Sequence, residues 1–168
     1  MPWLTLVRHA KSSWEQEGLD DHERPLNRRG LRTAPRMGEY LRGFEPPVDL
    51  FWSSTARRAQ ETAELLRESL GSRAPLRLDR RLYLAPPEGI RDLVSGLEEE
   101  QEAPGHVLLV AHNPGLEVLV SALAGRPVPF PTCAAARIEL PRAWEDLGAG
   151  RARLVGLARP REVLGDSG

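Results

Sequence analysis

Two histidines and an arginine stand at points where an apolar run of the chain stops. Arg8 and His9 follow residues 4–7, and His112 follows residues 106–111. Open α/β sheets bind ligands at the carboxyl ends of their parallel strands. There an arginine can hold phosphate oxygens in a fork of hydrogen bonds, and a neutral imidazole can attack phosphorus. These residues therefore indicate phosphoryl chemistry, with a surface arginine beside a half-buried histidine as the purely structural alternative.

A third candidate strand ends in the same way. Residues 48–52 read as a strand, Ser53 and Ser54 follow it, and Arg57 and Arg58 lie one turn into the helix that comes next. If the three strands are parallel neighbours, two histidines and one or two arginines converge on one edge of the sheet. Helix N-termini at that edge add free N–H groups and partial positive charge. The combined pattern predicts a pocket for a phosphoryl group.

Strands that alternate with helices must position these residues. The sequence predicts strands at residues 3–8, 48–52, 76–78, 106–111, 134–140 and 152–158. It predicts helices at residues 29–43, 56–70 and 88–99, and a fourth helix that follows residue 115 and ends near residue 124. This alternation is typical of a three-layer α/β/α domain with a mainly parallel central sheet, and we expect a single domain over residues 1–168.

Three stretches depart from these regular patterns. Residues 10–28 read as a long polar loop, and a loop of that length is usually functional or disordered. Pro35 falls inside a helical pattern, where proline is tolerated near the first turn, so we expect the helix to start later or to kink. Residues 160–168 are expected to be a frayed terminus.

Composition bounds the classes of function. The chain has 168 residues, of which 40% are hydrophobic, enough for a domain with a buried core. Its 23 basic and 24 acidic residues give a net charge of −1, so no overall charge attracts nucleic acid or an anionic membrane. The single Cys133 excludes an internal disulfide and a multi-cysteine metal site. We expect a cytoplasmic protein, because no membrane-spanning run or signal-peptide pattern is visible.

Four blocks of the sequence resemble the histidine phosphatase superfamily, and within it the small SixA-like phosphohistidine phosphatases. The blocks are, in order, Leu-Val-Arg-His-Ala (6–10), Glu-Arg-Pro-Leu-Asn-Arg-Arg-Gly (23–30), Ser-Ser-Thr-Ala-Arg-Arg-Ala-Gln-Glu-Thr-Ala (53–63) and Val-Ala-His-Asn-Pro-Gly (110–115). Ala10 departs from the glycine of the broad family. The resemblance implies a phosphoglycerate mutase-like fold and a phosphatase that forms a phosphohistidine enzyme intermediate without a metal or cofactor.

The same resemblance assigns four catalytic positions. His9 matches the nucleophilic histidine, and Arg8 matches the arginine beside it. Arg58 matches the arginine of the family's Ser-x-x-x-Arg-Ala block, with Arg57 as the competitor for that role. His112 matches the second histidine. We expect His112 to be protonated and to neutralise phosphoryl oxygens together with the arginines.

Five further residues are candidates for contact with the substrate. Lys11 and Ser12 continue directly from the nucleophile. Arg24 could bind phosphate, or it could form a salt bridge within its loop. Asn113 follows the second histidine. Glu88 precedes a helix and is the candidate for a general acid, although the helix dipole alone also favours a glutamate in the first turn.

Two classes of function remain open at this point. The first is an enzyme that removes phosphate from phosphohistidine in a protein, or a phosphomonoesterase that acts on a small phosphorylated metabolite. The second is a binding module that holds the phosphorylated ligand but turns it over poorly. The two histidines and the arginine pair favour the enzyme. No metal site is expected, because neither an HExxH motif nor a cluster of aspartates is present. We expect the chain to be a monomer or a weak homo-oligomer.

Overall fold

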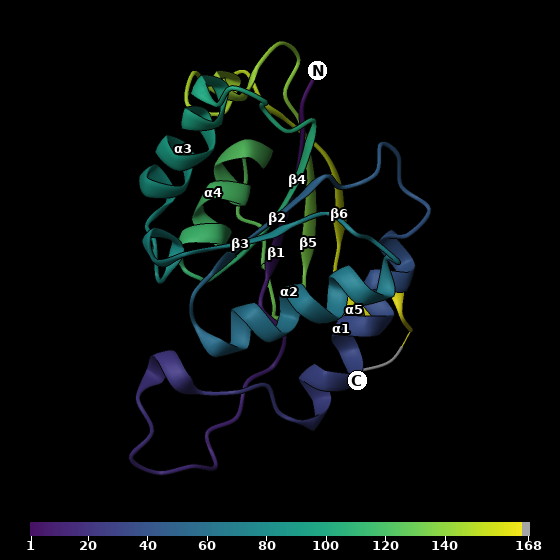
Figure 1. The fold of residues 1–168 in the computed structure, drawn as a ribbon, viewed down its shortest axis with the longest axis vertical. Coiled ribbons are helices and arrows are strands. Elements are labelled where there is room, and N and C mark those ends of the chain that lie inside the picture. Colours follow the sequence, from purple (N-terminus) through teal and green to yellow (C-terminus); the bar gives the residue numbers. More distant parts are fainter. Residues whose placement is uncertain (166–168) are drawn as a thin grey trace.

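A six-stranded sheet with helices on both faces forms the centre of the computed structural model, which describes residues 1–165 (Figure 1). In chain order the strands are β1 (Trp3–Arg8), β2 (Leu50–Ser54), β3 (Leu76–Asp79), β4 (His106–Ala111), β5 (Ala135–Glu139) and β6 (Arg153–Ala158). Across the sheet they lie in the order β3-β2-β4-β1-β5-β6. The first four in that order pair in parallel, whereas β5 pairs antiparallel with both β1 and β6. The predicted three-layer fold with a mainly parallel sheet is therefore confirmed.

Two pairs of helices cover the two faces of the sheet, with a short fifth helix beside one pair (Figure 1). The helices are α1 (Arg28–Leu41), α2 (Arg57–Ser69), α3 (Pro87–Ser95), α4 (Gly115–Ala124) and α5 (Pro160–Val163). Short 3-10 helices are η1 (Asp21–Glu23), η2 (Arg80–Leu82), η3 (Gly96–Glu99) and η4 (Trp144–Asp146). None of the helices in residues 1–165 has the length and apolarity that crossing a membrane requires.

The central strands are apolar on both faces because helices cover both. On β1, Leu4 and Leu6 belong to the cluster with α3 and α4, and Val7 belongs to the cluster with α1 and α2. Such strands read as continuous apolar runs rather than as alternating ones. In the parallel pairing of β1 with β4, Arg8 lies opposite Ala111. The residues that follow these two strands, His9 and His112, therefore leave the sheet side by side.

The strand β2 differs from its predicted bounds in a way that matters for the site. It begins at Leu50 rather than at residue 48, and it includes Ser53 and Ser54. Both serines are fully buried. Ser54 therefore ends the strand at the same edge as His9 and His112, instead of lying in a loop beyond it.

Helix α1 answers one part of the expectation for Pro35. The helix begins at Arg28 rather than later, and Pro35 lies in its interior. The side chain of Asn27 accepts a hydrogen bond from the backbone N–H of Gly30 and so fixes the helix start. Ala34 and Met37 are fully buried against the cluster that contains α2. This packing offsets the backbone hydrogen bond that proline cannot donate.

The C-terminal segment corrects a second expectation, that residues 160–168 are frayed. Residues 160–163 form α5, and Val163 and Leu164 pack against the cluster of α1 and α2. Arg36 on α1 donates a hydrogen bond to the backbone oxygen of Leu164 at 3.2 Å. Residues 166–168 lie outside the described part of the chain.

The long loop between β1 and α1 is folded back on itself. Ser12 and Leu26 form an antiparallel bridge, and the backbone N–H of Asn27 donates to the Lys11 carbonyl at 3.0 Å. Gly30 packs directly on this turn, where an added Cβ would overlap the Lys11 carbonyl oxygen. The close contact ties the start of α1 to the residues that follow His9.

We predict that Gly30→Ala lowers the stability of the fold by about 1–3 kcal/mol, because the methyl group must displace the backbone at Lys11. Chemical unfolding measures the change. Gly43→Ala is the matched control, since a Cβ at position 43 meets no atom within 4 Å. Equal stabilities of the two variants would show that the contact at Lys11 is not tight.

Candidate active site

His9 lies at the end of β1 with 7% of its surface exposed. Its Nδ1 is 2.7 Å from the backbone oxygen of Ala10. A carbonyl oxygen only accepts hydrogen bonds, so Nδ1 carries the proton and Nε2 has a free lone pair. Burial, followed by the positive charges of Arg58 and Arg8, lowers the pKa of His9 to about 3 despite the bond to Ala10. The imidazole is therefore neutral near pH 7, with Nε2 as its basic atom.

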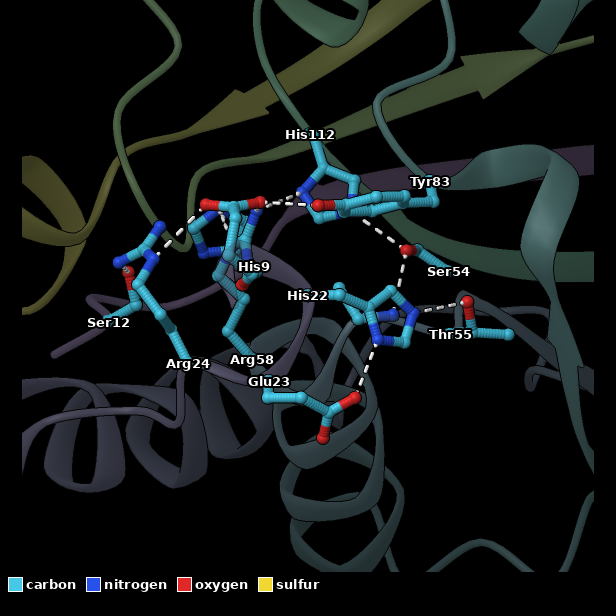
Figure 2. A network of polar contacts seen from close by, with 12 residues as sticks. His9, Ser12, His22, Glu23, Arg24, Ser54, Thr55, Arg58, Tyr83 and His112 are labelled. Atoms are coloured by element: carbon cyan, nitrogen blue, oxygen red, sulfur yellow. Dashed lines mark hydrogen bonds and ion pairs between the residues drawn. The ribbon is translucent and has the colours of Figure 1, made fainter. Parts of the chain in front are cut away.

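Arg58, the second residue of α2, lies against both histidines and is 3% exposed (Figure 2). Its Nε donates to Nε2 of His9 at 3.4 Å, and its Nη2 lies 3.5 Å from Nδ1 of His112. Arg57, in contrast, points outward and forms an ion pair with Glu61 at 3.5 Å. The structure thus brings Arg58, and not Arg57, to the edge of the sheet.

His112 follows β4 and is 2% exposed. Because a guanidinium cannot accept, its Nδ1 accepts from Arg58. Its Nε2 then carries the proton and donates to Oγ of Ser54 at 2.8 Å. Burial, together with His9 and Arg58, lowers the pKa of His112 to about 3. Among the groups of the protein alone, the ring is therefore neutral near pH 7, so the expected protonated form requires a neighbouring anion.

Asp21 is the residue of this site that the sequence analysis missed. Its backbone oxygen accepts from Nη1 of Arg58 at 2.7 Å, and its Oδ2 accepts from Nη2 at 3.0 Å. Tyr83 donates to the same Oδ2 at 2.6 Å, and Arg24 donates to Oδ1 at 3.1 Å. Burial raises the pKa of Asp21, but the hydrogen bonds from Tyr83 and Arg58 outweigh it and hold the pKa at about 2. Asp21 thus holds one edge of the Arg58 guanidinium and leaves the other edge facing the histidines.

Arg8 is the last residue of β1. Together with Arg58 it forms the cationic wall of the site. Its Nη1 donates to the backbone oxygen of Phe130 at 3.3 Å. Its Nε is buried and has no hydrogen-bond partner among the described residues. Burial lowers the pKa of Arg8 although Glu117 raises it. A buried guanidinium nitrogen without an acceptor is costly, so an anionic ligand would stabilise this wall.

A cavity of about 300 Å³ joins these side chains. Lys11, Ser12 and Arg24 line it, as predicted. Arg24 is largely buried and donates to Oγ of Ser12 at 2.8 Å, while its guanidinium lies 3.5 Å from the ring centroid of Trp14. The structure thus shows the predicted salt bridge of Arg24, with Asp21, and it also places Arg24 where its guanidinium could contact a bound phosphate.

The last two predicted residues differ in their placement. Asn113 lines the cavity, but both ends of its amide are engaged, with Phe130 O at 2.8 Å and the backbone N–H of Glu117 at 3.2 Å. Glu88 lies exposed in the first turn of α3 and is not among the residues that line the cavity. The structure therefore does not bring Glu88 to the histidines.

This arrangement can bind a phosphoryl group and attack it. The unprotonated Nε2 of His9 faces a concave site with two arginines, and the imidazole rings of His9 and His112 lie 5.3 Å apart. Within residues 1–165 no group of three or more His, Cys, Asp or Glu side chains is placed to hold a metal ion. The positive charge of the described site comes from arginine and lysine side chains.

Comparisons with known proteins agree with this geometry. Residues 4–83 match the Histidine phosphatase superfamily (branch 1). An uncharacterised protein of Mycobacterium tuberculosis is 33% identical over 166 residues, which cover 92% of this chain and 100% of that protein. The match extends well beyond residue 125, where the motifs of the family are no longer visible in the sequence.

Solved structures give the same result for the fold. A structure from Agrobacterium tumefaciens, provisionally named phosphohistidine phosphatase SixA, is similar with a TM-score of 0.79 and 27% identity, over 95% of this chain and 99% of that one. The alpha-ribazole phosphatase of Shigella flexneri shares the fold with a TM-score of 0.68 at 19% identity, over 94% and 96% of the two chains. With its matching blocks, its sheet and its paired histidines, the chain belongs to the histidine phosphatase superfamily and is SixA-like within it.

Proposed function

We propose that this protein removes phosphate from phosphohistidine in a protein, through a covalent phosphohistidine on His9. The observation that carries the proposal is the state of His9. Its Nδ1–H is held by Ala10, and its Nε2 lone pair lies in a cationic pocket, where it accepts a 3.4 Å hydrogen bond from Nε of Arg58 that the attack on phosphorus replaces. The first step is an in-line attack of the Nε2 lone pair on phosphorus. The bond from phosphorus to the substrate's imidazole nitrogen breaks, and that nitrogen keeps the electron pair.

The cationic wall stabilises the charge on the transferred group. The edge of Arg58 that faces the histidines presents Nε and one N–H of Nη2, which fit two phosphoryl oxygens. Arg8, which also lines the cavity, supplies a second guanidinium. Because these donors are fixed before the substrate enters, they require little rearrangement during the reaction.

Water completes the reaction. Attack of a water oxygen on phosphorus breaks the bond to Nε2 of His9, releases inorganic phosphate and restores the lone pair. Among the groups of the protein alone, His112 is neutral near pH 7. A phosphoryl dianion beside it favours the charged imidazolium, so we infer that His112 takes up a proton when the phosphoryl group binds.

The carboxylates explain why we favour phosphohistidine over an ester. An alkoxide needs a proton on the oxygen that leaves, whereas the imidazole of phosphohistidine can carry a proton on its other ring nitrogen near neutral pH and then leaves as a neutral ring. Asp21 is the carboxylate among the described residues of the cavity, and with a pKa of about 2 it is ionised and cannot donate a proton. Glu88 lies outside the cavity. The site thus has the groups for transfer of the phosphoryl group, but its described lining offers no protonated carboxyl group to act as the general acid for an ester.

We predict that the protein turns over a phosphohistidine peptide at least a hundredfold faster than alkyl phosphate esters, since general acid catalysis contributes about 10²–10⁴-fold where it is needed. Activity should survive exhaustive chelation, because arginines supply the positive charge. Glu88→Gln should retain most of the activity on the peptide. A wild type that prefers the esters, and a Glu88→Gln variant that loses a hundredfold on them, would identify a metabolite phosphatase instead.

We also predict that Arg58→Ala lowers kcat/KM on the peptide by about 10²–10³-fold, the usual effect of removing one fixed donor to a charged transition state. Arg57→Ala is the matched control, and we expect less than about a threefold change because its ion pair with Glu61 is exposed. Steady-state kinetics on correctly folded variants, checked by circular dichroism, makes the comparison. A larger loss in Arg57→Ala would show that Arg57, and not Arg58, binds the phosphoryl group.

A further inference from the structure

A second groove, of about 620 Å³, opens directly beside the catalytic cavity. Arg8, Lys11 and Thr132 line both hollows. The far wall of the groove comes from the loop 129–133 and from residues 159–162, which include the start of α5. Because the two hollows share three lining residues, a molecule whose phosphoryl group lies at His9 can extend past Arg8, Lys11 and Thr132 into this groove.

The groove is basic although the chain as a whole has a net charge of −1. Its basic residues are Arg8, Lys11, Arg29, Arg159 and Arg161. Two glutamates also line it, and both are engaged: Glu162 pairs with Arg159 at 2.9 Å, and Glu117 accepts from the backbone N–H of Phe130 at 2.7 Å. The local excess of positive charge is thus a property of this surface and does not follow from the composition.

Two of these cations have no ion-pair partner among the described residues. Lys11 and Arg161 are exposed, and within residues 1–165 no carboxylate forms an ion pair with either. They lie in a hollow rather than on a convex surface, so a ligand can reach both. The transferred phosphoryl group does not require them, because Arg8 and Arg58 already face it.

We propose that this groove binds a second anionic group, a carboxylate or a phosphate, carried by the same molecule as the transferred phosphoryl group. The proposal rests on the proposed function and defines its substrate more closely. In a phosphorylated protein the second group is an acidic side chain close to the phosphohistidine. In a small metabolite it is a carboxylate or another phosphate a few bonds from the phosphoryl group.

Matched substrates separate these two sources. The first pair is one phosphohistidine peptide with two glutamates beside the phosphohistidine, and the same peptide with two glutamines. The second pair is phosphoglycolate and ethyl phosphate, which differ by a carboxylate. We expect the acidic member to have a kcat/KM about three- to tenfold higher, mainly through KM, and the preference to shrink as salt is added.

Charge reversal at one residue tests whether the groove causes this preference. In Arg161→Glu the preference for the acidic member should disappear or reverse. Arg73→Glu is the matched control: Arg73 is also exposed but follows the end of α2 and lines neither hollow, and the preference should remain. A preference in the ester pair alone would support the groove and assign it to a metabolite.

Measurements of substrate binding test the groove without requiring turnover. Calorimetric affinities for the same pairs in a His9→Ala background report the groove even if no substrate is hydrolysed, an outcome that would contradict the proposed function alone. Equal affinities within both pairs, or an unchanged preference in Arg161→Glu, would overturn the second anion site.

Discussion

The hydrogen bond from Nδ1 of His9 to the Ala10 carbonyl determines which nitrogen of the ring can react. It leaves the lone pair on Nε2, and the structure directs that atom at Arg58. Two other features set the remaining geometry of the site. Arg58 reaches both histidines because Asp21 holds its opposite edge, and the two histidines lie together because β1 and β4 pair in parallel with their ends level. A change in the orientation of His9 would leave the arginines with no nucleophile beside them.

Burial sets the charges of this site. Desolvation lowers the pKa of both His9 and His112 to about 3, so two imidazoles can lie among arginines without being charged themselves. Asp21 partly balances the arginines and stays ionised. A phosphoryl dianion that enters the pocket meets cations that are already fixed in position. Little free energy is then spent on rearranging them as the reaction proceeds. The hydrogen bonds that keep Asp21 ionised leave the described lining of the pocket without a protonated carboxyl group, and this favours a leaving group that needs none.

Much of this site could be predicted from the sequence, because its main residues directly follow apolar strands. The ends of two strands carry Arg8, His9 and His112, and the start of a helix carries Arg58. The parallel order of the central strands is enough to bring these residues together. Asp21 could not be found in this way, since it lies within a long loop and contacts a residue 37 positions later only through the folded structure. The neutral state of His112 depends on burial, which its neighbours in sequence do not reveal. Interior packing of α1, rather than local propensity, likewise decides that Pro35 is tolerated.

The isomer of the phosphoenzyme tests this account most directly. Brief reaction with a phosphodonor, followed by alkaline quenching, preserves phosphohistidine, and phosphorus–proton correlation spectra distinguish phosphate on Nε2 from phosphate on Nδ1. Because Nδ1–H is bound to the Ala10 carbonyl, the account predicts a single adduct on Nε2 of His9 that is absent from His9→Ala. Phosphate on Nδ1 of His9, or on His112, would contradict it.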